Sequence, residues 1–181
     1  MANGTVALSR AWTWVVPARE ADWEALYAEQ LPRVYNFFRY RVGDGPAAED
    51  LTSLTFEKAW RARHRYRRDL AAFGTWLFTI ARNVATDHFR QHRTHVSLDE
   101  AAHIRADTTP EEIAERRSDD ERLNRLLASL PERERELLSL KYGADLTNRA
   151  IARLTGLSES NVGTILHRSI ATLRAAWNEG A

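Results

Sequence analysis

The chain has 181 residues, of which 44% are hydrophobic, enough for the core of one ordinary domain or of two small ones. It contains no cysteine, which excludes disulfides and thiolate metal sites and fits a reducing compartment. The net charge of +1 conceals segregation, because residues 1–21 carry +1, 22–93 carry +3, 94–121 carry −6 and 122–181 carry +3. Two basic modules thus flank an acidic connector, a distribution suited to two nucleic-acid-binding surfaces.

Residues 1–21 are predicted to be an N-terminal extension. Its apolar run, Ala11–Val16, is too short to span a bilayer, and the single arginine before that run is a weak start for a signal peptide. We therefore expect a cytoplasmic protein with no membrane insertion. Trp12 and Trp14 are expected to pack on the module that follows.

Two helices are predicted to open the first module, residues 22–94. The first begins after Asp22, a plausible N-cap, and Pro32 is expected to kink or interrupt it. The second runs from Pro46 to about Arg63. Acidic residues in its first turn are explained equally well by the helix dipole. Its spacing nevertheless gathers five residues on one face: Glu49, Asp50, Ser53, Leu54 and Glu57.

Arginines crowd the end of the second helix and the loop that follows it. Residues 54–93 carry nine Lys or Arg against three Asp or Glu, interleaved with His64, Tyr66, Phe73 and Trp76. Such a patch is commonly a solvated face. Cations for the backbone and rings for the bases are also what single-stranded nucleic acid needs.

The segment from Phe73 to Arg93 predicts one long helix with two unlike faces. One face is apolar, with Phe73, Trp76, Leu77, Ile80, Ala81 and Val84 at helical spacing. The other supplies cations for phosphates, and an amide and hydroxyls for bases or backbone: Thr79, Arg82, Asn83, Thr86, Arg90 and Arg93. Taken alone, the segment fits an amphipathic helix with a solvated basic face equally well.

No metal site and no cofactor are predicted. His88, His92 and His95 recur at helical spacing and could present three imidazoles together, but no cysteine or carboxylate completes a ligand set. We assign these histidines to the basic surface. The chain also lacks a nucleophile paired with a base and a phosphate-cradling glycine loop, so we predict that it is not an enzyme.

Residues 95–121 are predicted to be a flexible acidic linker, in which Thr109 and Pro110 could start a short helix. The second module, residues 122–178, reads as four helices. Pro131 opens its second helix, Thr147 caps a short third one, Gly156 makes a turn and Ser158 caps the last. A plain helical bundle is the alternative to the helix-turn-helix that this order indicates.

The last helix is expected to bury Val162, Leu166, Ser169 and Leu173. The residues left outside are of the types that read a DNA groove, namely Ser160, Asn161, Thr164, Arg168 and His167. The predicted fold class is therefore all-α, with two small helical domains joined by a flexible acidic linker, the second a helix-turn-helix.

Three stretches resemble the extracytoplasmic-function (ECF) sigma factors, the smallest members of the sigma-70 family. Phe73–Leu77 followed by Ile80–Asn83 resembles their promoter-melting segment. Ala48–Leu51 with Phe56, Ala59 and Trp60 is similar to the segment that grips the RNA polymerase clamp, with departures at Ser53 and Leu54. The second module resembles the family's module that reads the upstream promoter element. The resemblance lies in Leu130–Arg133, Ile151–Ala152, Gly156–Ser158 and Leu166–Arg168, and the sequence departs from the family pattern at Ala150, Gly163 and Ile165.

The resemblance implies roles for named residues. Melting and binding of the downstream promoter element would involve Arg65, Arg67, Arg68, Trp76, Arg82, Asn83, Thr86 and Arg90. The loop 67–72 would hold a flipped base. Reading of the upstream element would involve Arg149, Ser158, Ser160, Asn161, Thr164, His167 and Arg168. The polymerase clamp would meet Asp50, Ser53, Leu54 and Glu57.

We thus expect an alternative sigma factor that binds core RNA polymerase and directs promoter recognition, melting and transcription initiation. Its partners would be core polymerase and promoter DNA, both as duplex and as non-template single strand, with an anti-sigma factor as a further candidate. The rival hypothesis is a two-domain helix-turn-helix regulator that binds duplex DNA without acting as a polymerase subunit. A basic and aromatic surface on the first module favours the sigma factor.

Overall fold

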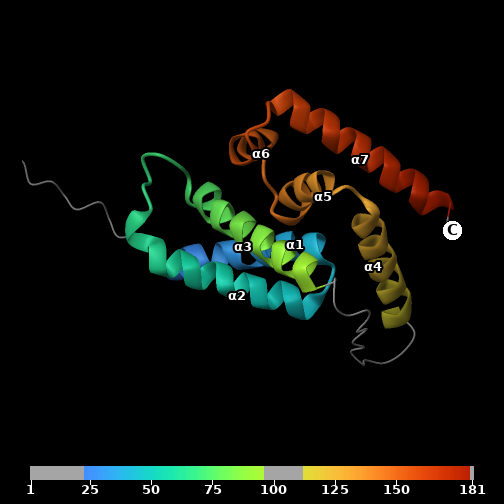
Figure 1. Cartoon of the computed structure of the whole chain (residues 1–181), viewed down its shortest axis with the longest axis horizontal. Helices are drawn as coiled ribbons and strands as arrows, with labels where there is room; N and C mark the ends of the chain where they lie inside the picture. Colours follow the sequence, from blue (N-terminus) through green and yellow to red (C-terminus); the bar gives the residue numbers. More distant parts are fainter. Residues whose placement is uncertain (1–22, 96–111, 180–181) are drawn as a thin grey trace, which may run out of the picture.

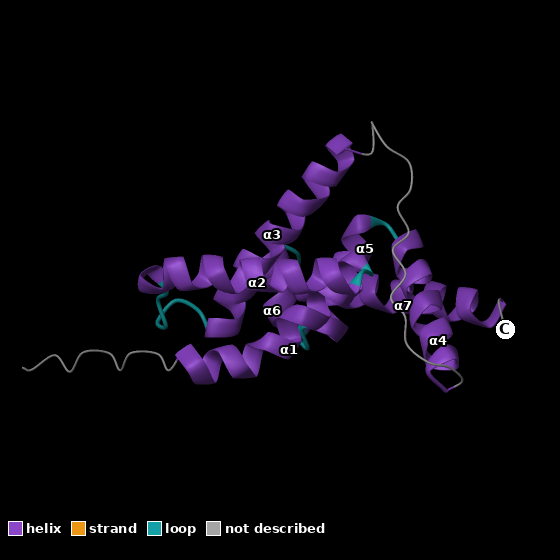
Figure 2. Ribbon diagram, turned by 90° about the horizontal axis from the view of Figure 1, so that it is seen from below, coloured by secondary structure: helices purple, strands orange, loops and turns teal. Residues whose placement is uncertain are grey.

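The structure is a computed structural model that describes residues 23–95 and 112–179. The predictions for Asp22, Trp12, Trp14 and the Thr109–Pro110 helix start lie outside these residues. The described parts contain helices and no strand, which confirms the all-α prediction. Figure 1 shows α1 to α3 grouped as the first module and α4 to α7 as the second, and Figure 2 shows the same helices from below.

The first module is built from α1 (Trp23–Val42), α2 (Gly45–Ala62), the short 3-10 turn η1 (Arg63–Arg65) and α3 (Phe73–His95). Asp44 caps α2, because its carboxylate accepts a hydrogen bond from the Ala47 amide at 3.0 Å. Pro32 lies inside α1 and is exposed, and the helix runs through it without interruption.

The core of the first module is aromatic at its centre. Phe37, Phe38 and Phe78 are fully buried, and the rings of Phe37 and Phe78 meet edge to face with their centroids 5.8 Å apart. On α3 the predicted residues Phe73, Leu77, Ala81 and Val84 are buried, whereas Trp76 and Ile80 are half-buried. Phe78 and Ala85, which were not predicted, are buried as well, so the apolar face of α3 is wider than predicted.

The second module comprises α4 (Glu112–Ser129), α5 (Glu132–Leu138), the π-helical turn η2 (Ser139–Gly143), α6 (Asn148–Thr155) and α7 (Glu159–Glu179). Helix α4 begins before the predicted start near Arg122 and includes part of the predicted linker. Its first ten residues are mostly charged helix formers without an apolar stripe, so hydrophobic periodicity did not indicate them.

Local hydrogen bonds produce the helix-turn-helix where it was predicted. The Thr147 hydroxyl accepts from the Ala150 amide at 3.2 Å, and the Ser158 hydroxyl accepts from the Asn161 amide at the same distance. Between the two helices Gly156 adopts φ +73°, a left-handed conformation that favours glycine. Val162, Leu166 and Ser169 are buried as predicted, whereas Leu173 is only half-buried. These contacts fix α7 as the second helix of the motif.

The two modules are packed against each other. Arg33 of α1 donates from Nε to the Ala144 carbonyl at 2.9 Å and from Nη2 to the Asp145 carbonyl at 3.1 Å. Asn124 of α4 donates to the Gly43 carbonyl at 3.1 Å. A Cβ added to Gly143 would lie 2.8 Å from the Asn36 carbonyl oxygen, so the two backbones touch there. Figure 1 shows α5 and the turn after it facing the first module.

Candidate nucleic-acid and polymerase interfaces

The polar face of α3 is exposed along most of its described length. Asn83, Thr86 and Arg90 are exposed, and their spacing places them near one line along the helix. The Thr86 hydroxyl donates to the Arg82 carbonyl at 2.9 Å within the helix, and Arg90 is paired with Asp87 at 3.0 Å. Asn83 makes no side-chain hydrogen bond with any part of the chain that the structure describes. Its amide is therefore available to a ligand.

Arg82 is the exception on this face. Its side chain is only 25% exposed, and its Nε donates to a carboxylate oxygen of Glu136 in α5 at 2.8 Å. Its Nη1 donates to the carbonyl of Leu154 in α6. A residue predicted to meet promoter DNA is thus occupied by the second module.

The arginines of the loop before α3 are exposed. Arg65 precedes the loop 67–72, and Arg67 and Arg68 are its first two residues. Two guanidinium nitrogens of Arg67 contact the two carboxylate oxygens of Asp69 at 3.0 and 2.9 Å. This hydrogen-bonded pair lowers the pKa of Asp69 and raises that of Arg67. Because both side chains lie in water, the pair is weak and a phosphate could replace Asp69.

The rings near this loop do not all face solvent. Phe73 is buried, as its place on the apolar face predicted, so it does not serve as one of the base-stacking rings that the arginine-rich patch also suggested. Its ring centroid lies 5.3 Å from that of Trp23 and 5.4 Å from that of Tyr66. Trp76 is half-buried and packs against Tyr66, with the two ring centroids 5.2 Å apart. Trp76 therefore supports the module's core with one side and leaves part of its ring accessible.

The predicted clamp-binding residues all lie on the outer side of α2. Asp50, Ser53, Leu54 and Glu57 are exposed, and Leu54 keeps 38% of its surface in solvent. On the opposite side of α2, Leu51, Thr52 and Thr55 are buried. An apolar side chain between acidic ones on a free helix face is suited to a protein partner.

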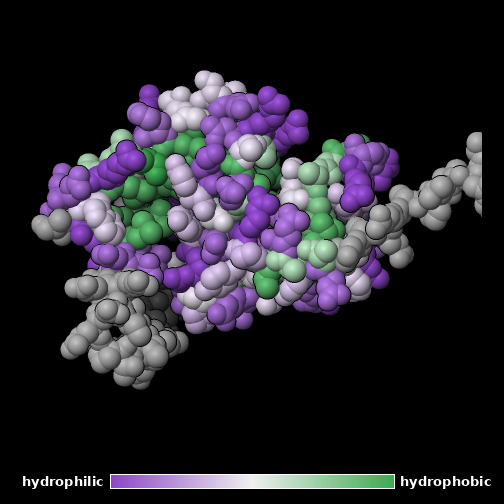
Figure 3. Space-filling view, turned by 180° about the vertical axis from the view of Figure 1, so that it is seen from behind, coloured by the Kyte–Doolittle hydropathy of each residue, from purple (hydrophilic) through white to green (hydrophobic). Residues whose placement is uncertain are grey.

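The helix-turn-helix presents one polar face. Ser160, Asn161, Thr164, His167 and Arg168 are exposed on α7. Arg149 of α6 lies 3.6 Å from Glu159 at the start of α7. The Ser158 hydroxyl is used in capping, so its predicted contact with DNA competes with a structural role. Most of the surface seen in Figure 3 is hydrophilic, with hydrophobic side chains gathered in a few places.

Family models match each module separately, and related proteins match the two modules together. The sigma-70 region 2 family model matches residues 26–95, and the sigma-70 region 4 family model matches residues 120–173. The RNA polymerase sigma factor CarQ of Myxococcus xanthus is 35% identical over 160 residues, which cover 86% of this chain and 89% of CarQ. The ECF RNA polymerase sigma factor BldN of Streptomyces coelicolor is 32% identical over 160 residues, covering 86% of this chain and 61% of BldN.

The chain belongs to the ECF sigma factors of the sigma-70 family. Its fold is similar to that of the sigma factor RpoE from Bartonella quintana, solved in complex with the anti-sigma factor NepR. The TM-score is 0.68 at 20% identity, over 87% of this chain and 97% of RpoE. The first module thus corresponds to region 2 and the second to region 4.

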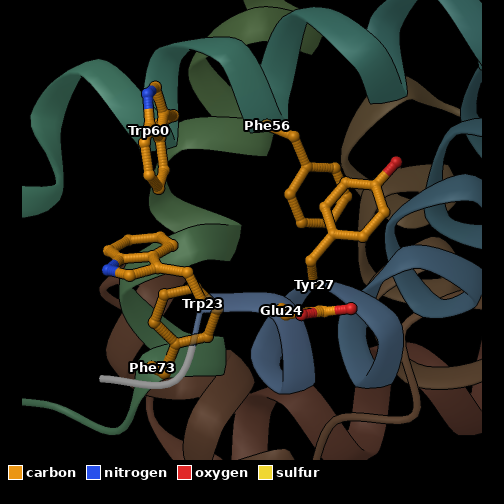
Figure 4. Close-up of a pocket in the computed structure, with 6 residues that line it drawn as sticks. All are labelled: Trp23, Glu24, Tyr27, Phe56, Trp60 and Phe73. Carbon is orange, nitrogen blue, oxygen red and sulfur yellow. The ribbon is translucent and has the colours of Figure 1, made fainter. Parts of the chain in front are cut away.

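This sigma factor has an aromatic pocket of about 490 Å³ that was not predicted from the sequence. Figure 4 shows Trp23, Glu24 and Tyr27 of α1 opposite Phe56 and Trp60 of α2, with Phe73 at the base. Trp60 is 51% exposed, and the Arg63 guanidinium lies over its ring, 4.0 Å from the centroid. The sequence does contain a pattern that could have predicted the pocket, since α1 and α2 each carry two aromatic residues four positions apart.

Among the side chains that the structure describes, no group of His, Cys, Asp and Glu residues could hold a metal ion. The side chains of His92 and His95, which belong to the metal-site alternative considered from the sequence, are not among those described. No helix in the described ranges combines the length and apolar character required to cross a membrane.

Proposed function

We propose that this chain is an alternative sigma factor that binds core RNA polymerase and directs promoter recognition, melting and initiation of transcription. The observation that carries the proposal is the presence, in one chain, of two separate polar helix faces and a third face with an exposed leucine. Family membership gives these faces their assignment to DNA and polymerase. A regulator that only bound duplex DNA would need the face of α7 alone.

The α7 face would read the upstream promoter element. Asn161 and Arg168 supply an amide and a guanidinium for base edges, and Thr164 supplies a hydroxyl. Arg149 would contact the DNA backbone. Gly163 and Ile165 bring no cation to this helix, so we propose a recognition mode with few phosphate contacts and modest salt dependence.

The α3 face and the loop before it would melt the downstream element and bind the non-template strand. Arg65, Arg67 and Arg68 would track the phosphates, and the accessible part of Trp76 would stack on a base. Asn83 would hydrogen-bond an exposed base edge, since its amide is not used inside the module. Arg82, Thr86 and Arg90 would fix the position of the strand.

The exposed face of α2 would bind the polymerase clamp. Leu54 would be buried in the interface, while Asp50, Ser53 and Glu57 would surround it with polar contacts. We also propose that the protein catalyses no reaction of its own and works in the cytoplasm, where polymerase and the chromosome are found. An anti-sigma factor is a further proposed partner, as NepR is for RpoE of Bartonella quintana.

Promoter opening tests this function directly. Genomic fragments that bind the reconstituted holoenzyme would be treated with permanganate, which oxidises unpaired thymines. The proposal predicts a short reactive segment that requires both core polymerase and this protein. Duplex binding by the protein together with unreactive DNA in the presence of core would favour the rival regulator.

A further inference from the structure

The guanidinium of Arg82 in region 2 donates to oxygen acceptors, as it would to the oxygens of a phosphate. A carboxylate oxygen of Glu136 lies 2.8 Å from its Nε, and the Leu154 carbonyl accepts from its Nη1. Negatively charged and carbonyl oxygens placed around a guanidinium satisfy the donors that a backbone phosphate would otherwise use. Glu136 is itself 19% exposed, so this pair is shielded from solvent screening more than the other ion pairs on α3.

We propose that Glu136 acts as an internal substitute for a promoter phosphate, so that the docked region 4 occupies Arg82 and competes with single-stranded DNA for α3. The proposal rests on the proposed function of α3 as the strand-binding helix. It adds a regulated step, because the two modules must separate before Arg82 can meet the strand.

A second charged group in the interface, Arg41, is incompletely paired. Arg41 is 3% exposed and reaches Glu132, yet its Nε has no hydrogen-bond partner within the described chain. Burial lowers the pKa of Arg41, which Glu136 and Glu132 oppose. Burying an incompletely paired charge costs free energy that is recovered when the modules part. The charged contacts of Arg82 and Arg41 therefore favour opening, whereas the backbone contact at Gly143 and the apolar core shared by the two modules favour docking.

Two substitutions should destabilise the docked state in different ways. Glu136→Gln removes the charge that pairs with Arg82. Gly143→Ala places a Cβ 2.8 Å from the Asn36 carbonyl oxygen and 2.9 Å from the Phe37 Cα, both in the opposite module. Glu121→Gln is the matched control, because it changes net charge equally at an exposed pair within α4.

The full-length proteins would be compared for binding to a short, labelled single strand of mixed sequence. If only a fraction of the wild type is open, its apparent dissociation constant is raised by the inverse of that fraction. We expect Glu136→Gln and Gly143→Ala each to tighten binding by about fivefold or more. Glu121→Gln should change it less than about twofold, because one exposed charge is largely screened.

Module separation would be measured in parallel by energy transfer between dyes. The chain has no cysteine, so Glu49→Cys and Thr172→Cys would place single dyes on α2 and α7. Both docking variants should lower the transfer, and added single strand should lower it in the wild type. Helical content measured by circular dichroism would verify that both modules remain folded.

The outcomes separate the proposal from the function beneath it. Open variants that bind the strand no more tightly than wild type or the control would overturn the competition and leave strand binding intact. Equal tightening by Glu136→Gln and Glu121→Gln would overturn the phosphate-substitute role. If no variant bound the strand, including those shown to be open, the proposed function of α3 would fail as well.

Discussion

Replacing Asn83 with alanine should damage promoter selectivity and spare the fold. The side chain is exposed on α3 and bonds to nothing in the described chain, while its neighbours Val84 and Ala85 are buried. Loss of an exposed, unbonded amide changes the free energy of unfolding by about 0.5 kcal/mol or less. Paired hydrogen bonds from an amide to a base edge contribute about 1–3 kcal/mol of discrimination, which is about 5- to 150-fold in preference.

The assay pairs thermal melting with holoenzyme binding to a series of downstream-element variants. Asn178→Ala is the matched control, because it removes the same amide from an exposed position in the last turn of α7. We expect the Asn83 variant to melt like the control and to bind the best and second-best elements almost equally. A lowered melting temperature with an unaltered ranking of promoters would refute the reasoning and assign Asn83 to the fold.

Three further substitutions have outcomes that follow from burial and pairing. Leu54→Glu should weaken association with core polymerase by about tenfold or more in a pull-down titration, whereas Leu70→Glu, at a leucine that is 75% exposed, should leave it unchanged. Phe78→Ala removes a fully buried ring and should lower the free energy of unfolding by about 3–5 kcal/mol in chemical denaturation; a smaller loss would mean that the core collapses around the gap. Asp69→Asn should free Arg67 and steepen the salt dependence of strand binding by up to about one phosphate contact, and an unchanged slope would exclude Arg67 from that surface.

Features set by local chemistry were predictable from the sequence. The caps at Thr147 and Ser158 and the left-handed Gly156 depend on residues only a few positions apart, so they placed the helix-turn-helix correctly. The polar outer faces of α2 and α7 followed from helical spacing for the same reason. Family resemblance then supplied roles that spacing alone left open.

Features set by contacts between distant segments were not predictable. Arg82 suits a phosphate or a carboxylate equally well, and only the docked structure shows Glu136 beside it. Nothing local to Gly143 indicates that another backbone approaches it. Helical spacing predicted the burial of Phe73, but not that Trp23, fifty positions earlier, supplies the ring that covers it.

Run-off transcription tests the central claim most directly. Purified core polymerase would be incubated with genomic fragments in the presence and absence of this protein. The account predicts transcripts with fixed 5′ ends that appear only when the protein is present and that diminish with Leu54→Glu. Absence of such transcripts, despite saturating binding of the protein to DNA and to core polymerase, would contradict its assignment as the subunit that starts transcription.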